Sequence, residues 1–371
     1  MITVLADDLT GGAEIAGVCL RYGLSVAFDF DFQIERFPLL TDVWIIATDT
    51  RSALEKDACD TVRAIAHRLK QTQTDAIFKK IDSALRGHVV AEIEALRECF
   101  PIEKALILPA NPDTGRIIKD GVYFVGSLPL HQTAFANDPD FPATTSIVRE
   151  MPGLSMNNCG FEIITPDILS VDDYKNYAKH LHSGVLPVGG SVFFEACLPV
   201  FFPSINRDAK PVGNERKFLM ICGSTHEASI RFARENRIFE RLEIDSAHVE
   251  ELLDNPNMLK GLLILAARMV ERHNKLLVEV RNKSGISVSS DKVKELLARI
   301  TADLVKECGI NELFIEGGAT ARACARAAGF SSLVPVCEYS RGVVRFKVSG
   351  AGNLHLTVKP GSYEWSYKLF E

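Results

Sequence analysis

The chain has 371 residues, more than the roughly 100–200 residues usual for one domain, so we expect two domains. Hydrophobic residues make up 47% and charged residues 24%, a balance that is typical of packed globular proteins and excludes a disordered chain. The net charge is −6 and no long basic run is present. Nucleic acid is therefore not expected as a partner, although an anionic ligand can still bind in a local basic pocket.

The sequence carries no signal for export or for a membrane. Its first residues, MITVLADDLT, lack the basic start and apolar core of a signal peptide. The longest apolar stretch, around 262–267, is far shorter than the roughly 20 residues that cross a bilayer. The nine cysteines contain no CxxC pair and lie mostly in apolar sequence, which favours buried free thiols over disulfides or a structural zinc site. We expect a cytoplasmic protein without a membrane partner.

The first half of the chain alternates short apolar runs with stretches of helical spacing. Strands are predicted at 2–6, 24–30, 42–47, 75–79 and 104–108, and helices at 11–22, 54–72 and 88–99. This order indicates parallel βαβ units with helices over both faces of the sheet.

A second α/β series follows a polar stretch, PSINRDAKPVGNER, that has the composition of an interdomain linker. Its strands are predicted at 217–221, 275–280 and 312–315, and its helices near 226–236, 291–307 and 320–328. The stretch 343–361 indicates an antiparallel hairpin that turns through Gly350 and Gly352. We therefore predict an α/β fold of two domains, each a largely parallel sheet flanked by helices, with an antiparallel hairpin near the C-terminus. The domains are expected at 1–205 and 217–371, joined by a linker at 206–216.

Two adjacent acids, Asp7 and Asp8, follow the first predicted strand. They are poorly suited to core packing, and ligands of open α/β sheets bind beyond the carboxyl ends of the strands. Asp8 would accept hydrogen bonds from substrate hydroxyls or take a proton from one of them. The alternative is that Asp7 or Thr10 simply caps the following helix.

Cations gather after two further strands of the first half. The TDTR motif places Arg51 after strand 42–47, and KKIDSALRGH follows strand 75–79 with Lys79, Lys80, Asp82, Ser83 and Arg86. Arginine suits bidentate carboxylate recognition, and Ser83 and Arg86 lie at the expected start of a helix. Cations for a carboxylate beside acids for hydroxyls describe a sugar-acid site. The alternative is that Arg86 and the lysines form a solvated helix end.

A fourth turn, PANPDTGR, follows strand 104–108 and ends at Arg116. Its prolines, asparagine and glycine favour an irregular loop. Arg116 either faces the ligand or ties this loop down, and the sequence leaves both open.

The turns of the second half are rich in glycine. Strand 217–221 leads into Cys222, Gly223, Ser224 and Thr225, and strand 312–315 leads through Glu316 into Gly317, Gly318, Ala319 and Thr320. Free backbone N–H groups at a helix N-terminus bind anions, and glycine lets phosphates approach the backbone closely. Small glycine turns also serve plain strand-to-helix packing, and neither a P-loop nor a GxGxxG fingerprint is present. A last tight turn, KPGS, follows the hairpin at 359–362.

In this order, the motifs ADDLTGGAE, TDTR, KKIDSALRGH, PANPDTGR, GGATA and KPGS resemble those of the four-carbon acid sugar kinase family. That family includes D-threonate, D-erythronate, L-threonate and 3-oxo-tetronate kinases, and the motifs span nearly the whole chain. The resemblance implies an N-terminal acid-sugar domain and a C-terminal nucleotide domain. It also implies that the chain uses ATP and Mg²⁺ to phosphorylate a hydroxyl of a four-carbon acid sugar.

The resemblance carries over to individual residues. It implies sugar-acid contacts at Asp8, Arg51, Lys80, Ile81, Asp82 and Ser83, to which the strand-end argument adds Arg86. It implies ATP contacts at Ser224, Gly317, Gly318, Ala319, Thr320 and Gly361. Asp8 and Asp82 are the candidates for orienting or deprotonating the attacking hydroxyl, and no residue is assigned to a metal.

Two departures from the family pattern keep other functions open. Many members carry Asp where this chain has Ala319, and KPGSYEW replaces their KPGSFG ending. A catalytically weak sensor that binds acid sugar and nucleotide is therefore one alternative. An aldolase or lyase that uses Lys79 or Lys80 as a Schiff base is another.

Overall fold

The computed structural model describes residues 1–30, 41–138, 141–154, 160–203, 217–224, 226–282, 285, 288–330, 332–361, 363–366 and 369–370. The chain divides into two compact units, Met1–Asp208 and Ala209–Glu371, called here the N-terminal and the C-terminal unit. The predicted linker at 206–216 lies outside the described residues. Within the described part of the chain, no helix is long and apolar enough to span a membrane.

The main sheet of the N-terminal unit is parallel throughout, in the order β2-β3-β1-β4-β10-β5-β9. Its strands are β1 (Ile2–Ala6), β2 (Val26–Asp29), β3 (Val43–Ala47), β4 (Ala76–Lys80), β5 (Lys104–Leu108), β9 (Glu162–Ile164) and β10 (Val185–Gly189). Its helices are α1 (Leu9–Arg21), α2 (Glu55–Leu69), α3 (Val89–Arg97), α4 (Val171–Ala178) and α5 (Ser191–Phe201). The parallel sheet predicted from the apolar runs is confirmed.

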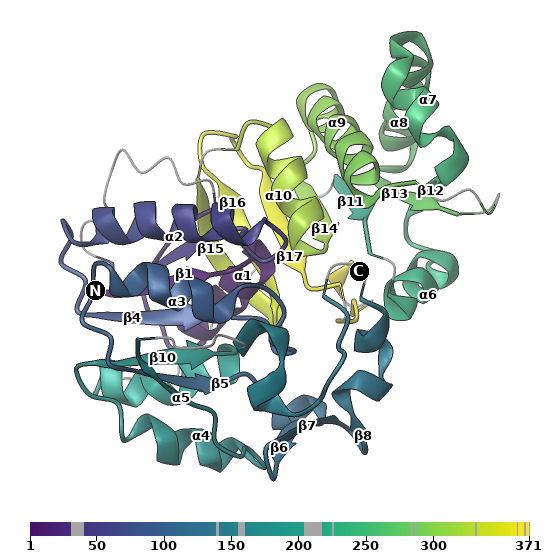
Figure 1. Cartoon of the computed structure of the whole chain (residues 1–371). Helices are drawn as coiled ribbons and strands as arrows, with labels where there is room; N and C mark the ends of the chain where they lie inside the picture. Colours follow the sequence, from purple (N-terminus) through teal and green to yellow (C-terminus); the bar gives the residue numbers. More distant parts are fainter. Residues whose placement is uncertain are drawn as a thin grey trace. The chain divides into compact units, whose positions relative to one another are not determined.

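Helices cover both faces of this sheet (Figure 1). Helix α1 packs with α5, and α2 packs with α3. Consecutive side chains of a strand point to opposite faces, and on β4 Lys79 pairs with Glu92 of α3 whereas Lys80 lies 3.5 Å from Glu14 of α1. Helices α1 and α3 therefore lie on opposite sides, as the βαβ pattern predicts.

A small antiparallel sheet was not expected from the sequence. It consists of β6 (Arg116–Lys119), β7 (Val122–Val125) and β8 (Leu128–Pro129), followed by short 3-10 turns. Ile118 and Tyr123 are its buried residues, and the Tyr123 hydroxyl donates to the Ser83 carbonyl at 2.6 Å. This bond fixes the small sheet against the turn that follows β4.

The sheet of the C-terminal unit has the order β12-β13-β11-β14-β17-β16-β15. The first five strands are parallel, and the last two pair antiparallel. They are β11 (Phe218–Cys222), β12 (Glu240–Asp245), β13 (Lys275–Arg281), β14 (Glu312–Glu316), β15 (Leu333–Ser340), β16 (Val343–Val348) and β17 (His355–Lys359). The helices are α6 (Glu227–Glu235), α7 (Val249–Asp254), α8 (Pro256–His273), α9 (Ser290–Cys308) and α10 (Gly318–Ala327). Strands β16 and β17 form the predicted hairpin.

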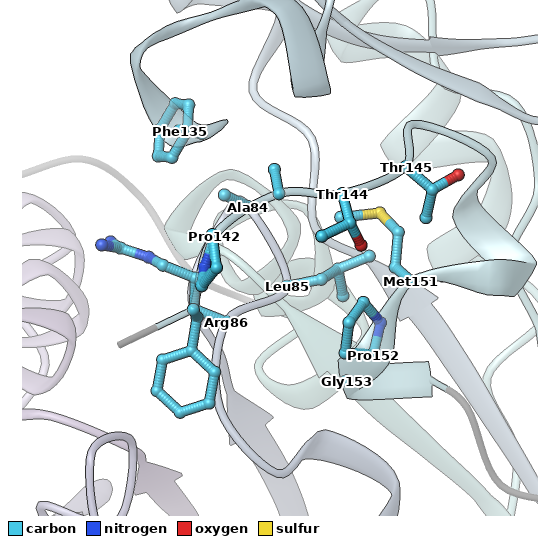
Figure 2. A pocket seen from close by; sticks show the side chains of 12 residues that line it. Ala84, Leu85, Arg86, Phe135, Pro142, Thr144, Thr145, Met151, Pro152 and Gly153 are labelled. Atoms are coloured by element: carbon cyan, nitrogen blue, oxygen red, sulfur yellow. The ribbon is translucent and has the colours of Figure 1, made fainter. Parts of the chain in front are cut away.

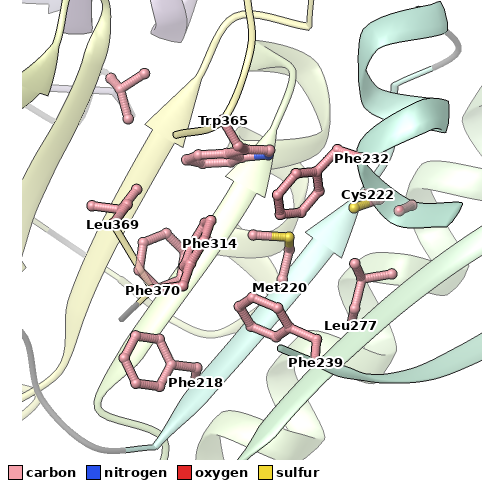
Figure 3. Packing of buried hydrophobic residues seen from close by; sticks show 12 residues of the cluster. Phe218, Met220, Cys222, Phe232, Phe239, Leu277, Phe314, Trp365, Leu369 and Phe370 are labelled. Atoms are coloured by element: carbon pink, nitrogen blue, oxygen red, sulfur yellow. The ribbon is translucent and has the colours of Figure 1, made fainter. Parts of the chain in front are cut away.

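The end of the chain contributes to the core of the C-terminal unit. Figure 3 shows Trp365 and Phe370 beside Phe314 of β14, with ring centroids 5.8 and 5.1 Å from the Phe314 ring. Leu369 and Phe232 of α6 belong to the same buried cluster. Burying a large apolar side chain contributes about 1.5–3 kcal/mol, so these last residues are a substantial part of this unit's stability.

The described cysteines are mostly buried free thiols. Eight of the nine are described, all eight are free thiols, and seven of them are buried. Burial raises the pKa of the Cys324 thiol to about 12 even though Thr301 donates to its sulfur. Thiols in this state are poor nucleophiles, which agrees with a packing role.

Candidate functional site

Three neighbouring strands of the N-terminal unit end at the same edge of the sheet. Strand β1 lies between β3 and β4, and Ala6 is in register with Ala47 and Lys80. The turns that follow these strands therefore meet. There Arg51 donates from Nε to Asp7 Oδ2 at 3.0 Å, and from Nη2 to Oδ1 of both Asp7 and Asp8 at 2.9 and 2.8 Å.

Asp8 begins helix α1 as its N-cap. Its Oδ1 accepts from the Gly11 backbone N–H at 2.8 Å, and its Oδ2 accepts from the Thr10 hydroxyl at 2.6 Å. The expectation that Asp7 or Thr10 caps this helix is therefore wrong, because Asp8 is the cap. Burial on its own raises the pKa of Asp8, but Arg51, Lys80 and these hydrogen bonds hold it below its ordinary value. The carboxylate stays ionised and can accept hydrogen bonds from hydroxyl groups.

Asp82 lies in the same cluster and is more fully occupied. Its Oδ2 accepts from the Ala84 N–H and from Arg86 Nε, both at 2.9 Å, and its Oδ1 accepts from Arg86 Nη2 at 2.8 Å. Arg51 Nη1 lies 3.9 Å from Oδ1. Burial opposes ionisation, but Arg86 and Arg51 bring the pKa of Asp82 far below its usual range. Such a carboxylate is a weak base, so Asp82 is the poorer of the two candidates for proton removal.

The turn that holds Asp82 has an unusual backbone. Leu85 adopts φ 58° and Gly87 adopts φ 91°. A left-handed conformation is costly for a branched side chain and persists where the surrounding structure imposes it. Here it lets the backbone N–H of Leu85 donate to the Asp82 carbonyl at 3.1 Å, which folds the turn back on the strand end.

The two lysines of the KKIDS motif have different environments. Lys79 is completely buried on the α3 side and lies 2.7 Å from Glu92, away from the turn cluster. Lys80 is on the α1 side, where its ammonium group donates to the Ile81 carbonyl at 3.0 Å and contributes to the electrostatic environment of Asp8. A buried Lys79 cannot reach a substrate carbonyl, which argues against the Schiff-base alternative at this residue.

Arg86 and Arg116 both donate hydrogen bonds to residues of the turn that follows β4. Arg86 also donates from Nη1 to Asp138 at 2.7 Å, and Arg116 donates from Nη1 to the Ser83 hydroxyl. Both guanidinium groups face the ring of Phe135, at 5.7 and 5.3 Å from its centroid. Asp138 follows its partner Arg86 by 52 residues and was missed at the sequence level, since no local pattern links the two.

A cavity of about 250 Å³ adjoins Arg86 (Figure 2). It is lined by Ala84, Leu85, Arg86, Phe135, Phe141, Pro142, Ala143, Thr144, Thr145, Met151, Pro152 and Gly153. In the figure the Arg86 side chain extends away from Met151 and Pro152. Ala84, Leu85 and Arg86, all from the turn after β4, form one wall of this cavity.

The glycine turns of the C-terminal unit also meet at one sheet edge. Strand β14 lies between β11 and β17, with Glu316 in register with Cys222 and Lys359. A Cβ on Gly223 would lie 2.4 Å from the Thr320 hydroxyl, and one on Gly361 would lie 2.8 Å from the Ser224 hydroxyl. The turns are therefore packed against each other, and side chains at these two glycines would separate them.

Gly317 is half-buried, and the described residues leave space above its Cα. Gly317 has φ 85°, and among the described residues a Cβ built on it would meet only Thr320 Oγ1, at 4.0 Å. Its N–H donates to the Lys359 carbonyl at 2.9 Å, which ties this turn to the KPG turn. Ala319 is exposed at the start of the ten-residue helix α10. Space above glycine beside a helix N-terminus fits a phosphate group.

Glu316, the acid nearest to these glycines in sequence, is buried beneath them. Trp365 Nε1 donates to Glu316 Oε1 at 2.5 Å, and Lys359 Nζ lies 3.6 Å from the same oxygen. Burial raises the pKa of Glu316 and lowers the pKa of Lys359, in both cases against the attraction of the other. Glu316 therefore supports the two turns from below and cannot contact a nucleotide.

Protein ligands for Mg²⁺ are sparse. The described residues contain no group of three or more His, Cys, Asp or Glu side chains that could hold a metal ion. At the β14–α10 turn, Ala319 is exposed and Glu316 is buried beneath it, so the turn presents no exposed acid.

Two domain families match the chain. A sugar-binding N-terminal domain matches residues 2–161, and a nucleotide-binding C-terminal domain matches residues 232–363. The D-threonate kinase of Bordetella bronchiseptica is 34% identical to this chain over a match that covers 41% of it. The D-erythronate kinase of Heliobacterium modesticaldum is also 34% identical, over a match that covers 43% of this chain. These two matches cover 39% and 37% of the relatives' own length. The D-threonate kinase of Salmonella typhimurium is 25% identical over 88% of this chain and 86% of its own.

Solved structures share the fold over the full chain. A protein of Salmonella typhimurium LT2, solved under the description of a tRNA synthase, has a TM-score of 0.80 at 18% identity and covers 100% of this chain and 97% of its own. Haemophilus influenzae protein HI1011 has a TM-score of 0.72 at 18% identity, with coverages of 100% and 98%. At these identities the likeness shows the fold alone. The two matching domains and the kinases related to them identify the chain as a member of the four-carbon acid sugar kinase family.

Proposed function

We propose that this protein is an ATP-dependent kinase that phosphorylates a hydroxyl of a four-carbon acid sugar, a threonate, an erythronate or an oxo-tetronate. The N-terminal unit would bind the sugar acid, and the C-terminal unit would bind ATP. We also propose that the two domains are residues 1–205 and 217–371, joined by a linker at 206–216. The protein would be cytoplasmic, and its partners would be the acid sugar and ATP.

One observation carries the proposal: an ionised carboxylate with spare hydrogen-bonding capacity lies among cations at the carboxyl edge of a parallel sheet. Oδ2 of Asp8 accepts one hydrogen bond, from Thr10, and a carboxylate oxygen can accept two. Arg51 and Lys80 keep this carboxylate charged although it is buried. A sugar hydroxyl is a donor that fits the remaining position.

In the proposed reaction, a hydroxyl oxygen of the sugar acid attacks the γ-phosphorus of ATP, and the bond from that phosphorus to the β-phosphate oxygen breaks, releasing ADP. The transition state of such a transfer is loose, so most of the catalysis lies in positioning and charge neutralisation. Because its pKa is lowered, Asp8 acts chiefly by orienting the hydroxyl and accepts its proton late. Mg²⁺ carried by the triphosphate would neutralise part of the phosphate charge.

The backbone at Gly317, Gly318, Ala319 and Thr320 supports the nucleotide part of the proposal. These residues begin helix α10, whose first N–H groups have no partner within the helix and carry its positive dipole end. Ser224 and Gly361 lie together beside this turn, where Ser224 Oγ is 3.4 Å from the Gly361 carbonyl. We assign phosphate contacts to this group.

The proposal is tested by coupled detection of ADP release from the full chain with ATP, Mg²⁺ and a panel of four-carbon acids. The panel contains D-threonate, L-threonate, D-erythronate and the 2-oxo and 3-oxo tetronates. We expect one of them to raise ADP release well above the rate with ATP alone, and mass spectrometry to find the monophosphorylated acid. Absence of any acid-dependent ADP release would overturn the proposal.

A second candidate is a sensor that binds both ligands without efficient turnover. The specific observation in its favour is that the β14–α10 turn offers no exposed acid: position 319 is an alanine, and Glu316 is buried beneath the turn. Saturable binding of ATP and of a tetronate with no product formation would favour this reading.

A further inference from the structure

Most guanidinium groups at the proposed sugar-acid site already hold carboxylates of the protein. Arg51 donates to Asp7 and Asp8, and Arg86 donates to Asp82 and Asp138. A substrate carboxylate that bound either arginine would have to displace one of these ionised, largely buried acids. Leaving a buried charge unpaired is costly, so neither arginine is well placed to hold the carboxylate of the substrate.

Arg116 differs from both. Among the described residues it forms no ion pair with a carboxylate, and its side chain contacts the Ser83 hydroxyl and the face of the Phe135 ring. Stacking on the ring fixes the guanidinium plane and leaves its edge directed to other ligands. Ser83 directly follows Asp82, so this unpaired cation lies at the cluster.

A buried acceptor without a partner lies beside Arg116. Only 8% of the surface of Asn111 is exposed, and its Oδ1 accepts no hydrogen bond from the described residues. Asn111 and Arg116 exchange both backbone hydrogen bonds, each 3.0 Å long, as an antiparallel pair. Side chains of directly paired residues project to the same side, which places the Asn111 amide next to the Arg116 side chain.

We propose that Arg116 and Asn111 form the subsite for the carboxylate end of the acid sugar. Arg116 binds the carboxylate, and Asn111 Oδ1 accepts a hydrogen bond from the neighbouring hydroxyl. Arg51 and Arg86 keep the carboxylates of the protein ionised and in place. This assignment rests on the proposed function for the identity of the ligand, and it makes the PANPDTGR turn the part of the site that distinguishes acids from neutral sugars.

The test measures binding by calorimetry on the full chain without nucleotide. The probes are D-threonate, L-threonate and D-erythronate, with threitol and erythritol as four-carbon polyols that lack the carboxylate. Arg116→Gln should weaken tetronate binding about 30-fold or more, the range for removing one partner of a desolvated charge pair, and leave polyol binding unchanged. Arg116→Lys should retain part of the acid affinity. Asn111→Ala should weaken acids and polyols alike, by about 10-fold.

Arg97→Gln is the matched control, because Arg97 also lies over an aromatic ring, 5.5 Å from the Phe161 centroid, but on helix α3. It should change neither affinity. Circular dichroism and thermal unfolding report whether each variant is folded, and if Arg116→Gln fails to fold, the acid-selective loss is sought in Arg116→Lys.

Three results would overturn the subsite: unchanged tetronate binding in Arg116→Gln, an equal loss of acid and polyol binding in Arg116→Gln, or no tetronate binding by the wild-type protein. Tetronate binding that depends on Arg116 without any phosphorylation would instead overturn the kinase proposal and leave the subsite standing.

Discussion

Arg51 donates a hydrogen bond of 2.8 Å to Asp8, so the arginine expected to hold the substrate holds the proposed base. The same nitrogen donates to Asp7 at 2.9 Å. The cluster is therefore organised before any ligand arrives, with its carboxylates charged and fixed. Arg51 should therefore contribute to the stability of the N-terminal unit even when no substrate is bound.

Arg51→Gln should lower the free energy of unfolding by about 3 kcal/mol or more, because Asp7 and Asp8 lose their guanidinium partner in a mostly buried site. The pKa of Asp8 is lowered in the folded protein, so its contribution to stability is complete above the unfolded pKa and is lost as pH falls through the folded pKa. Without Arg51 this pKa rises. The folded and unfolded pKa values then lie closer together, so the variant should be weakened relative to the wild type more at pH 8 than at pH 3, as urea unfolding across this range would detect.

Arg63→Gln is the control for this substitution, since Arg63 forms ion pairs with Asp60 and Glu98 at the surface. Exposed pairs contribute about 1 kcal/mol or less. Equal losses in the two variants would mean that the Arg51 cluster is not a buried charge network.

Asp8→Asn should lower turnover by about 10²–10⁴-fold while the tetronate still binds. The amide keeps the shape of the side chain and can accept a hydroxyl hydrogen bond through its oxygen, but it cannot take the proton. Turnover is measured by ADP release and binding by calorimetry. Asp60→Asn, on the exposed side of α2, should leave both unchanged, and wild-type turnover in Asp8→Asn would remove Asp8 from the chemistry.

The position of Asp8, Arg51 and Asp82 could be anticipated because each follows an apolar strand, and the carboxyl ends of parallel neighbours meet at one edge. The sequence did not predict that Arg51 would pair with the acids of the cluster themselves. Whether an arginine binds a ligand or a nearby acid depends on which strands are neighbours and on side-chain directions, and neither is encoded locally. Arg86 and Asp138 illustrate this, because their bond joins segments far apart in sequence.

Some elements were missed although the sequence held local signals for them. Helix α8 begins with Pro256 and is capped by Asn255, whose side chain accepts from two backbone N–H groups, a typical helix start. Helix α5 was obscured by Pro199 inside it. The packing of Trp365 on Phe314 had no local signal, since it depends on the return of the chain end to the sheet.

Gly361→Ala should weaken ATP binding at least 10-fold, because its Cβ would lie 2.8 Å from Ser224 Oγ and 3.2 Å from the His226 ring, so that the KPG turn must move. Gly261→Ala is the matched control. No atom lies within 4 Å of a Cβ there, and Gly261 is inside helix α8. It should leave ATP affinity unchanged and raise stability by about 0.5–1 kcal/mol. Unchanged ATP binding in Gly361→Ala would displace the nucleotide from this turn.

Trp365→Phe should lower the free energy of unfolding by about 1–3 kcal/mol, because the buried Glu316 carboxyl loses its indole donor. Burial raises the pKa of Glu316, so the folded state favours the protonated form and stability falls as pH rises through the folded pKa. Removing the donor raises that pKa further, so the loss of stability should be greater at pH 8 than at pH 5.

Trp44→Phe is the matched control for Trp365→Phe. Trp44 Nε1 donates at 2.6 Å to Asp29, a less buried acid that water can reach, so its loss should be smaller. Equal losses would contradict a buried Glu316.

Ala319→Asp should be tolerated, because the position is exposed and an acid in the first turn of a helix contributes about 0.3–1 kcal/mol through the helix dipole. If the missing acid limits this chain, Ala319→Asp should also raise ADP release with the best tetronate and lower the Mg²⁺ concentration needed for ADP to increase the unfolding temperature. Ala319→Asn, similar in shape but uncharged, should do neither. Identical behaviour of the two variants and the wild type would show that the protein does not need an acid at this turn. Turnover that is absent from the wild type and restored by Ala319→Asp would identify the natural chain as a sensor derived from a kinase.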